Sequence, residues 1–230
     1  MTPQVAKEIL DKIMGQIFGF QNPYSLEQFM QKYAFDIRLP VQVNDSTTGE
    51  PTWAQSANPT RFITMNNAHT KLGDGMRPPR PLGSIQDILG AWNEINLTAT
   101  ERQIESLNVG ESDNIYNSEN VYRSQDISRC KQVLFSDGIM DCEYIASGQR
   151  SQTSSFCARL EDSKECSNSF SVSWSGKVVN SMFIHDCYDM YESLFCSHVT
   201  SKKFCVANMQ YEEAEYRKIK EMVVRWILTS

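Results

Sequence analysis

A spacing of three residues runs from Ser106 to Cys205 without an inserted residue. Almost every third residue along this stretch is small, sulfur-containing or aliphatic, and all seven cysteines of the chain fall on these positions. In the first half, Val109, Ile115, Val121, Ile127, Val133, Ile139 and Ile145 alternate with Ser106, Ser112, Ser118, Ser124, Cys130, Ser136 and Cys142. In the second half, Leu160, Cys166, Val172, Val178, Ile184, Met190 and Cys196 alternate with Cys157, Ser163, Ser169, Ser175, Ser181, Cys187 and Ser193.

This period predicts a narrow parallel β-solenoid. An amphipathic helix needs apolar spacings of three and four and a half-buried strand needs two, so neither fits. A tightly wound solenoid turns every few residues and admits only small or β-branched side chains to its interior. The residues just before the early apolar positions accept corner dihedrals and can stack as amide ladders; they are Asn108, Asn114, Asn120, Asp126, Gln132 and Gly138. Coils of 12, 15 or 18 residues all keep the period, so the coil length stays open.

The first hundred residues have ordinary patterns. Thr2 and Pro3 predict the start of an amphipathic helix that ends near Gly19, and Ser25 with Gln28 predicts a capping box for a second helix. Residues 36–43 alternate like an edge strand, 50–81 read as irregular with Trp53, Phe62 and Ile63 as anchors, and Ser84 opens a third helix. The first helix is expected to pack on its own chain rather than on a partner subunit.

The C-terminus supplies an amphipathic stripe after Glu212 and Glu213. We expect this helix to lie over the last coil, because an open solenoid end exposes unpaired strand edges. The fold class is therefore α+β, with a small helical and irregular unit (1–105), a β-solenoid (106–210) and a C-terminal capping helix (211–230). The polar run 148–155 is expected to form a longer corner or an outward loop.

Composition restricts the partners. The 230 residues carry a formal net charge of -6, which favours neither nucleic acid nor an anionic membrane. The charged residues near the N-terminus are unlike a signal peptide, and no segment has the length of a membrane span. Seven cysteines on an interior spacing differ from a secreted disulfide framework, so we expect reduced thiols and cytoplasmic synthesis.

The candidate chemistry is weak. Cys157 and Cys166, Cys187 and Cys196, and Cys196 and Cys205 are each nine residues apart, with His185 and His198 nearby and His69 far from them. This is not the spacing of a compact zinc motif, and a free cysteine is most often a small buried hydrophobe. Asp186 with Asp189, or Glu161 with Asp162, would suit a polysaccharide-cleaving enzyme only if acids formed a column on one outer face. We predict no catalytic, cofactor-binding or metal-binding residue, and both solenoid histidines are expected to face outward.

Aromatic residues off the three-residue period are expected to point outward. They either pack under the terminal helices or form a contact face for other subunits, and the sequence leaves both open. These residues are Phe135, Tyr144, Phe156, Phe170, Trp174, Phe183, Tyr188, Tyr191, Phe195 and Phe204.

A more specific pattern lies near the end of the chain. It consists of Cys196, Val199, Lys202, Phe204, Cys205, Asn208, Gln210 and Tyr211, followed by Glu212, Glu213 and Tyr216. It resembles the closing signature C-x2-[LV]-x2-K-x-[YF]-C-x2-N-x-Q-Y-x-x-E-x-Y of an uncharacterised family of cysteine-rich repeat proteins found in tailed bacteriophages and small-genome bacteria. The first hundred residues lie outside the resemblance, and many interior cysteines of the family are serine or valine here. The resemblance therefore favours a virion component and transfers no catalytic or metal-binding residue.

These observations favour a non-enzymatic structural protein of a tailed-bacteriophage virion, in the capsid decoration, neck, or tail and baseplate. The solenoid would be its rigid module and residues 1–105 its attachment surface. One alternative is a cytoplasmic zinc-binding or protein-interaction scaffold, and another is a glycan-binding or glycan-cleaving tail appendage. The expected partners are other virion or scaffold proteins or copies of the chain itself, without nucleic acid or membrane. The expected location is the virion, assembled in the host cytoplasm, and otherwise the cytoplasm.

Overall fold

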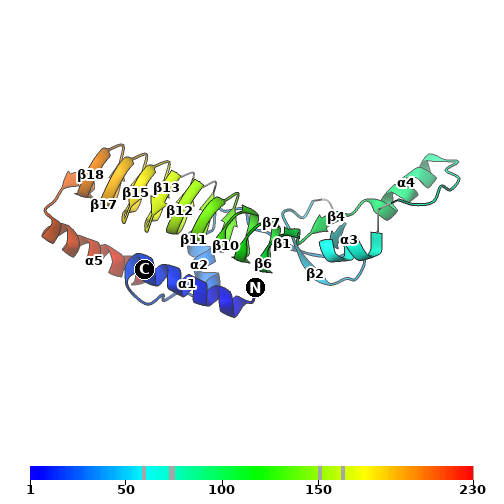
Figure 1. Ribbon diagram of the computed structural model, residues 1–230, viewed down its shortest axis with the longest axis horizontal. Coiled ribbons are helices and arrows are strands. Elements are labelled where there is room, and N and C mark those ends of the chain that lie inside the picture. Colours follow the sequence, from blue (N-terminus) through cyan, green and yellow to red (C-terminus); the bar gives the residue numbers. More distant parts are fainter. Residues whose placement is uncertain (59–60, 73–75, 150–151, 162–163, 230) are drawn as a thin grey trace.

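The computed structural model describes residues 1–230 except 59–60, 73–75, 150–151, 162–163 and 230. It also leaves undescribed the side chains of 71–72, 140–141, 143–144, 149, 152–157, 159–161 and 164–165. A parallel β-solenoid forms the long body, helices lie along one flank, and a small unit with a projecting arm continues the long axis at the N-terminal end of the solenoid (Figure 1). The predicted fold class is confirmed.

The solenoid has a coil of 12 residues. Val109 pairs with Val121, which pairs with Val133, and Cys166 pairs with Val178, all in parallel register. This register decides between the coil lengths that the sequence left open. The strands are β5 (Gln103–Ile104), β6 (Leu107–Gly110), β7 (Asp113–Tyr116), β8 (Glu119–Tyr122), β9 (Gln125–Ser128), β10 (Lys131–Asp137), β11 (Met140–Gln149), β12 (Gln152–Glu161), β13 (Lys164–Ser167), β14 (Phe170–Ser173), β15 (Gly176–Val179), β16 (Met182–His185), β17 (Tyr188–Ser197) and β18 (Thr200–Val206), with β19 (Met209–Gln210) antiparallel to β18.

Each coil turns four corners. Asn108, Glu111, Asn114 and Asn117 have φ of 53°, 49°, 65° and 46°, and the same left-handed conformation recurs every three residues along most of the described solenoid. Three residues per wall direct every third side chain inward, and the described positions of this period are buried from Ser112 to Cys196. The predicted interior is confirmed, and so are the six predicted corner residues. Asn108 donates to Asn120 over 2.6 Å, and Asn168 donates to Asn180 over 2.8 Å, so the predicted amide ladders also form.

The run 148–155 does not form the predicted loop. Gly148 and Gln149 end β11, residues 152–155 begin β12, and Met140 pairs with Gln152 in the same 12-residue register. Residues 150 and 151 lie outside the described residues.

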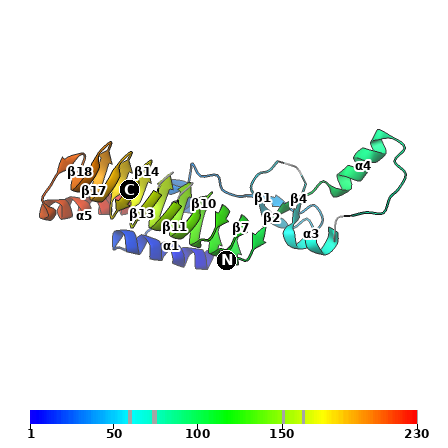
Figure 2. The same ribbon diagram turned by 45° about the horizontal axis from the view of Figure 1, so that its top comes forward.

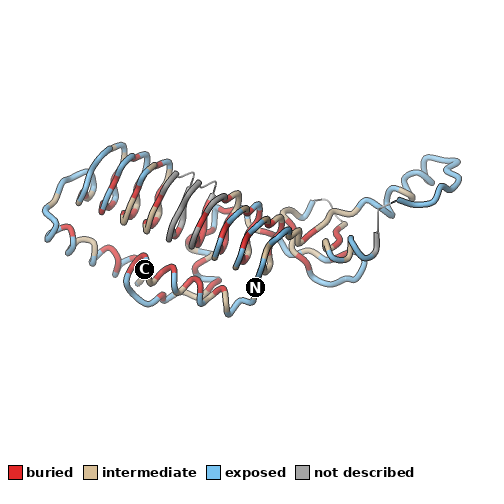
Figure 3. The backbone as a smooth tube through the Cα atoms, in the orientation of Figure 1, coloured by how far each residue is buried: buried red, intermediate tan, exposed pale blue. Residues whose placement is uncertain are grey.

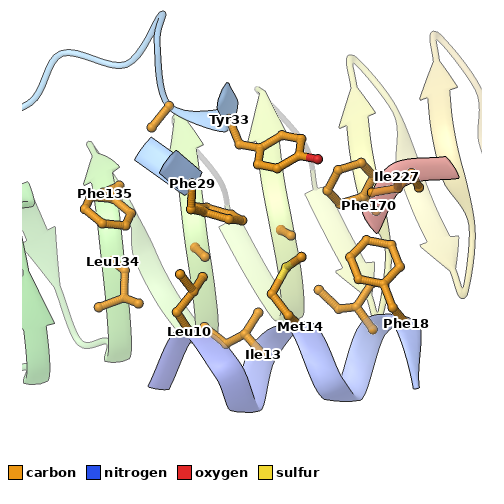
Figure 4. Packing of buried hydrophobic residues seen from close by; sticks show 14 of the residues in the cluster. Leu10, Ile13, Met14, Phe18, Phe29, Tyr33, Leu134, Phe135, Phe170 and Ile227 are labelled. Carbon is orange, nitrogen blue, oxygen red and sulfur yellow. The ribbon is translucent and has the colours of Figure 1, made fainter. Parts of the chain in front are cut away.

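Two N-terminal helices pack on the solenoid flank. They are α1 (Pro3–Phe18), capped by Thr2 and Gly19, and α2 (Leu26–Tyr33), whose predicted capping box between Ser25 and Gln28 is present. Leu10, Ile13, Met14 and Phe18 of α1 face side chains of the solenoid wall and of α2 in Figure 4. The wall has Ala146 and Ala158 among its buried positions and α1 runs beside β11 and β12, so small side chains allow a close approach. These helices therefore join the solenoid rather than the rest of residues 1–105.

The C-terminal helix α5 (Glu213–Thr229) begins at the last coil and then runs along the flank (Figure 1). The Tyr216 ring lies 5.3 Å from the Phe204 ring, whereas the Trp226 ring lies 5.9 Å from that of Phe183 in an earlier coil. The predicted position over the last coil thus holds only for the first turns. Lys220 and Arg217 bind the buried carboxylate of Glu192 at 2.8 and 3.2 Å and fasten α5 to the solenoid wall.

Residues 41–100 form the small unit at the start of the solenoid. Its elements are β1 (Val41–Asn44), β2 (Pro51–Ala54), β3 (Phe62–Thr64), α3 (Met65–Leu72), α4 (Ile85–Ile95) and β4 (Thr98–Thr100). The segment 50–81 is more regular than predicted, because β2 pairs with β1 and β3 pairs with β4. The predicted strand over 36–43 starts only at Val41, since Pro40 cannot donate a ladder hydrogen bond.

Candidate interaction surface

Residues 76–95 of the small unit form a projecting arm (Figure 1). The arm has two parts, a proline-rich segment (76–83) and helix α4, which lie side by side. Figures 1 and 2 both place the arm at the far end of the molecule from α5, beyond α3 and β4. Pro78, Pro79 and Pro81 favour an extended backbone over a helix, so the segment can lie straight along its neighbour.

Helix α4 forms as the sequence predicts. Ser84 accepts a hydrogen bond from the backbone of Asp87, and the Asp87 carboxylate accepts one from the backbone of Ser84, which completes a capping box. The helix is amphipathic, yet none of its residues, all of them described, is buried. The exposed fraction is 59% at Ile85, 53% at Leu89 and 54% at Trp92, and Figure 3 shows most of the arm as exposed.

An open groove of about 790 Å³ lies between the proline-rich segment and α4. It is lined by Met76, Arg77, Pro78, Pro79, Arg80, Leu82, Ile88, Ala91, Trp92 and Ile95. Its size is that of a pocket for a small ligand or for several side chains of a partner. Glu94 fastens the two walls together, because it accepts hydrogen bonds from Arg77 and, over 2.9 Å, from Arg80. These pairs also hold the pKa of Glu94 below its usual value.

An isolated helix of 11 residues is only marginally stable in water, and helices of globular proteins gain most of their stability by packing an apolar face. Exposed contiguous apolar surface on a folded protein marks an interaction site. The arm is therefore the strongest candidate for a docking element in the described chain.

The outward aromatics divide between the two readings that the sequence left open. Phe135, Phe170, Phe183 and Phe204 pack in the core between the solenoid and its helices. Trp174, Tyr188, Tyr191 and Phe195 stay exposed, although the Phe195 ring stacks 4.5 Å from that of Phe183. The side chains of Tyr144 and Phe156 lie outside the described residues.

The six cysteines whose side chains are described are buried, as predicted, but not all of them are reduced. Cys130 and Cys142 form a disulfide, with their Cα atoms 4.8 Å apart. They occupy the same interior column in consecutive coils, and the rise between coils brings paired positions within the Cα separation that a disulfide needs. The sequence signal for this disulfide is the 12-residue separation of the two cysteines. It can be recognised only when the coil length is known to be 12 residues.

Cys187, Cys196 and Cys205 are buried free thiols, while the side chain of Cys157 lies outside the described residues. Burial raises the pKa of the Cys187 thiol, and burial with the neighbouring Cys205 raises the pKa of Cys196 to about 11. Both thiols are therefore protonated at neutral pH, which suits packing rather than nucleophilic or metal-binding chemistry.

Among the remaining candidates, His185 and His198 lie one coil apart with their ring centroids 5.9 Å from each other, and the others are dispersed. His185 and His198 face outward, as predicted, and contact Ser173 at 3.1 Å and Asp186 at 2.7 Å. Asp189 accepts from Ser201, so Asp186 and Asp189 serve separate corners. His69 lies on α3, and the side chains of Glu161 and Asp162 are outside the described residues.

The described residues contain no group of three or more His, Cys, Asp or Glu that could hold a metal ion. Among the same residues, no helix has both the length and the apolar character to cross a membrane.

Comparison with known proteins gives no matching protein family, no matching curated protein and no matching solved structure.

Proposed function

We propose that this chain is a non-enzymatic structural protein of a tailed-bacteriophage virion, in which the solenoid is a rigid rod and the arm attaches it to a neighbouring protein. The observation that carries the attachment role is the exposed apolar face of α4, which is held away from the body by the small unit. The resemblance of the segment 196–216 to proteins from tailed phages supports the virion setting.

The body has the features of a rigid spacer. Parallel backbone pairing joins the coils, side-chain hydrogen bonds join their corners, and α1, α2 and α5 cover one wall with a second apolar core. The solenoid interior and the core under the helices lie on opposite sides of the same wall, so bending the rod would disturb both cores. A rigid rod with an attachment element at one end sets the distance between that element and whatever lies at the other end.

The proposal is tested by purifying particles on a density gradient from cells that make the protein and identifying their proteins by mass spectrometry. The chain is expected to co-purify with particles at a constant ratio to the capsid protein. A Leu89→Asp variant, which places a charge on the exposed face of α4, is expected to be absent from particles although it is soluble and folded.

Met222→Asp is the matched control, because Met222 is an exposed apolar residue of a helix on the body. This variant is expected to enter particles normally. If the wild-type chain stays in the soluble fraction, the virion proposal is wrong, and a cytoplasmic interaction scaffold that uses the same arm becomes the better description.

A further inference from the structure

The apolar face of α4 has the spacing of a helix that pairs with another helix. Ile85, Ile88, Trp92 and Ile95 follow one another at intervals of three, four and three residues. This is the a and d spacing of helix pairs that pack side by side, and Leu89 widens the stripe on one edge. Ile88, Trp92 and Ile95 border the groove beside the proline-rich segment, yet all four residues of the stripe are at least 44% exposed, so the face is open to a second amphipathic helix.

The charges of the arm are already compensated within it. Residues 76–95 contain two arginines and two acids, Arg77, Arg80, Asp87 and Glu94. Glu94 binds both arginines, and Asp87 binds the backbone and hydroxyl of Ser84. A strongly charged partner would find no unpaired opposite charge on the arm. A partner with a neutral apolar face, whose bordering charges are also paired, would be complementary to the arm. The arm of a second copy has this face by construction.

The position of the arm makes such a contact sterically accessible. It projects along the long axis, away from the solenoid and its helices, in both views of the molecule (Figures 1 and 2). Two arms can therefore meet while the two bodies point apart. A contact between the same face on two copies closes on itself as a two-fold dimer.

We infer that α4 of one copy packs against α4 of a second copy, so that the protein is a two-fold dimer joined through its arms. This inference rests on the proposed attachment role of the arm and names its occupant. The groove beside α4 offers room for side chains of the partner arm, with Trp92 on its wall. A membrane surface is a poorer partner for this face. Helices that lie in membrane interfaces carry lysine and arginine on their polar face, whereas the only charged residues of α4 are the acids Asp87 and Glu94.

Sedimentation equilibrium of the purified full chain over a range from micromolar to millimolar tests the inference. The wild type is expected to reach twice the 26.3 kDa mass of one chain. Leu89→Asp is expected to raise the dimer dissociation constant at least about 30-fold, the size of a hot-spot loss. Met222→Asp is expected to leave it unchanged. If circular dichroism shows that Leu89→Asp disturbs the fold, Ile85→Ser replaces it.

Three results would overturn the inference. They are a wild type that stays monomeric over the whole range, a dimer that survives Leu89→Asp, and binding of the wild type to phosphatidylcholine–phosphatidylglycerol vesicles that Leu89→Asp abolishes. The two proposals fail separately. A monomeric protein that still needs Leu89 to enter particles refutes only the second copy as occupant, and an arm-dependent dimer that no particle contains refutes only the virion role.

Discussion

The backbone N–H of Ser193 donates to the hydroxyl of Ser181, 12 residues earlier, over 3.0 Å. The Ser181 hydroxyl itself donates to the carbonyl of Val179 over 2.8 Å. The same pair of bonds occurs at Ser112 with Ser124 and at Ser118 with Cys130. Each of these three interior serines thus satisfies the carbonyl two residues before it and an N–H of the next coil, which is why buried hydroxyls are stable there.

Ser181→Ala is expected to lower the free energy of unfolding by about 1–3 kcal/mol, because it leaves the buried N–H of Ser193 without its acceptor. Urea denaturation followed by circular dichroism measures this loss. Ser201→Ala is the control, since Ser201 is exposed and binds only Asp189 among the contacts described; its expected change is within about 0.5 kcal/mol. Equal losses in the two variants would contradict the role of the interior hydroxyl.

Asn120→Val is expected to destabilise the solenoid by roughly 1–2 kcal/mol through backbone strain alone. Asn120 has φ of 59°, and no β-branched residue is among the described residues with positive φ. Asn120→Gly relieves the strain and removes only the bond from Asn108, so thermal melts should place it between the wild type and the valine variant. If glycine costs as much as valine, the amide ladder rather than the backbone conformation governs this corner.

Cys142→Ser is expected to lower the free energy of unfolding by about 2–3 kcal/mol, because it removes a cross-link between consecutive coils. A reducing agent should bring the wild type to the same stability, and non-reducing peptide mapping should recover the peptides of Cys130 and Cys142 joined. Cys187→Ser is the control, since Cys187 is a free thiol whose interior column holds serine at Ser175 one coil earlier. A wild type that is insensitive to reductant would show that the disulfide does not contribute.

Asp45→Asn is expected to destabilise the small unit by roughly 2–3 kcal/mol at neutral pH. The buried carboxylate accepts hydrogen bonds from the backbone and hydroxyl of Thr47, the backbone of Thr64 and the amide of Asn67. Burial alone would raise its pKa, but these donors outweigh burial and hold the pKa well below the ordinary value.

The pH dependence has a definite sign. A carboxylate whose pKa is lower in the folded state contributes its full stabilisation of the fold at pH values above its unfolded pKa, about 3.9. This contribution is lost as the pH falls below the unfolded pKa toward the folded one. The difference in melting temperature between the wild type and Asp45→Asn should therefore be constant from pH 7 to about pH 5 and shrink in stronger acid. A difference that grows on acidification would show that Asp45 is not bound as a carboxylate.

The sequence by itself determined the local rules of this protein. A period of three with small or β-branched residues inside, and residues that tolerate positive φ just before them, specifies walls of three residues because backbone sterics and interior volume act residue by residue. The helix starts at Thr2, Ser25 and Ser84 were predictable for the same reason, since a cap is a contact within four residues.

Only the tertiary structure decided how these pieces meet. A three-residue period is compatible with several coil lengths, so the bond between Cys130 and Cys142 became visible only when the 12-residue register set them one above the other. The same register decided that Phe170 lies under α1 and α2 while Trp174 faces outward. The apolar stripe of α4 looks in sequence like that of α1, but one is buried and the other exposed. The difference lies in long-range packing, because an amphipathic pattern encodes a face to be covered but not the surface that covers it.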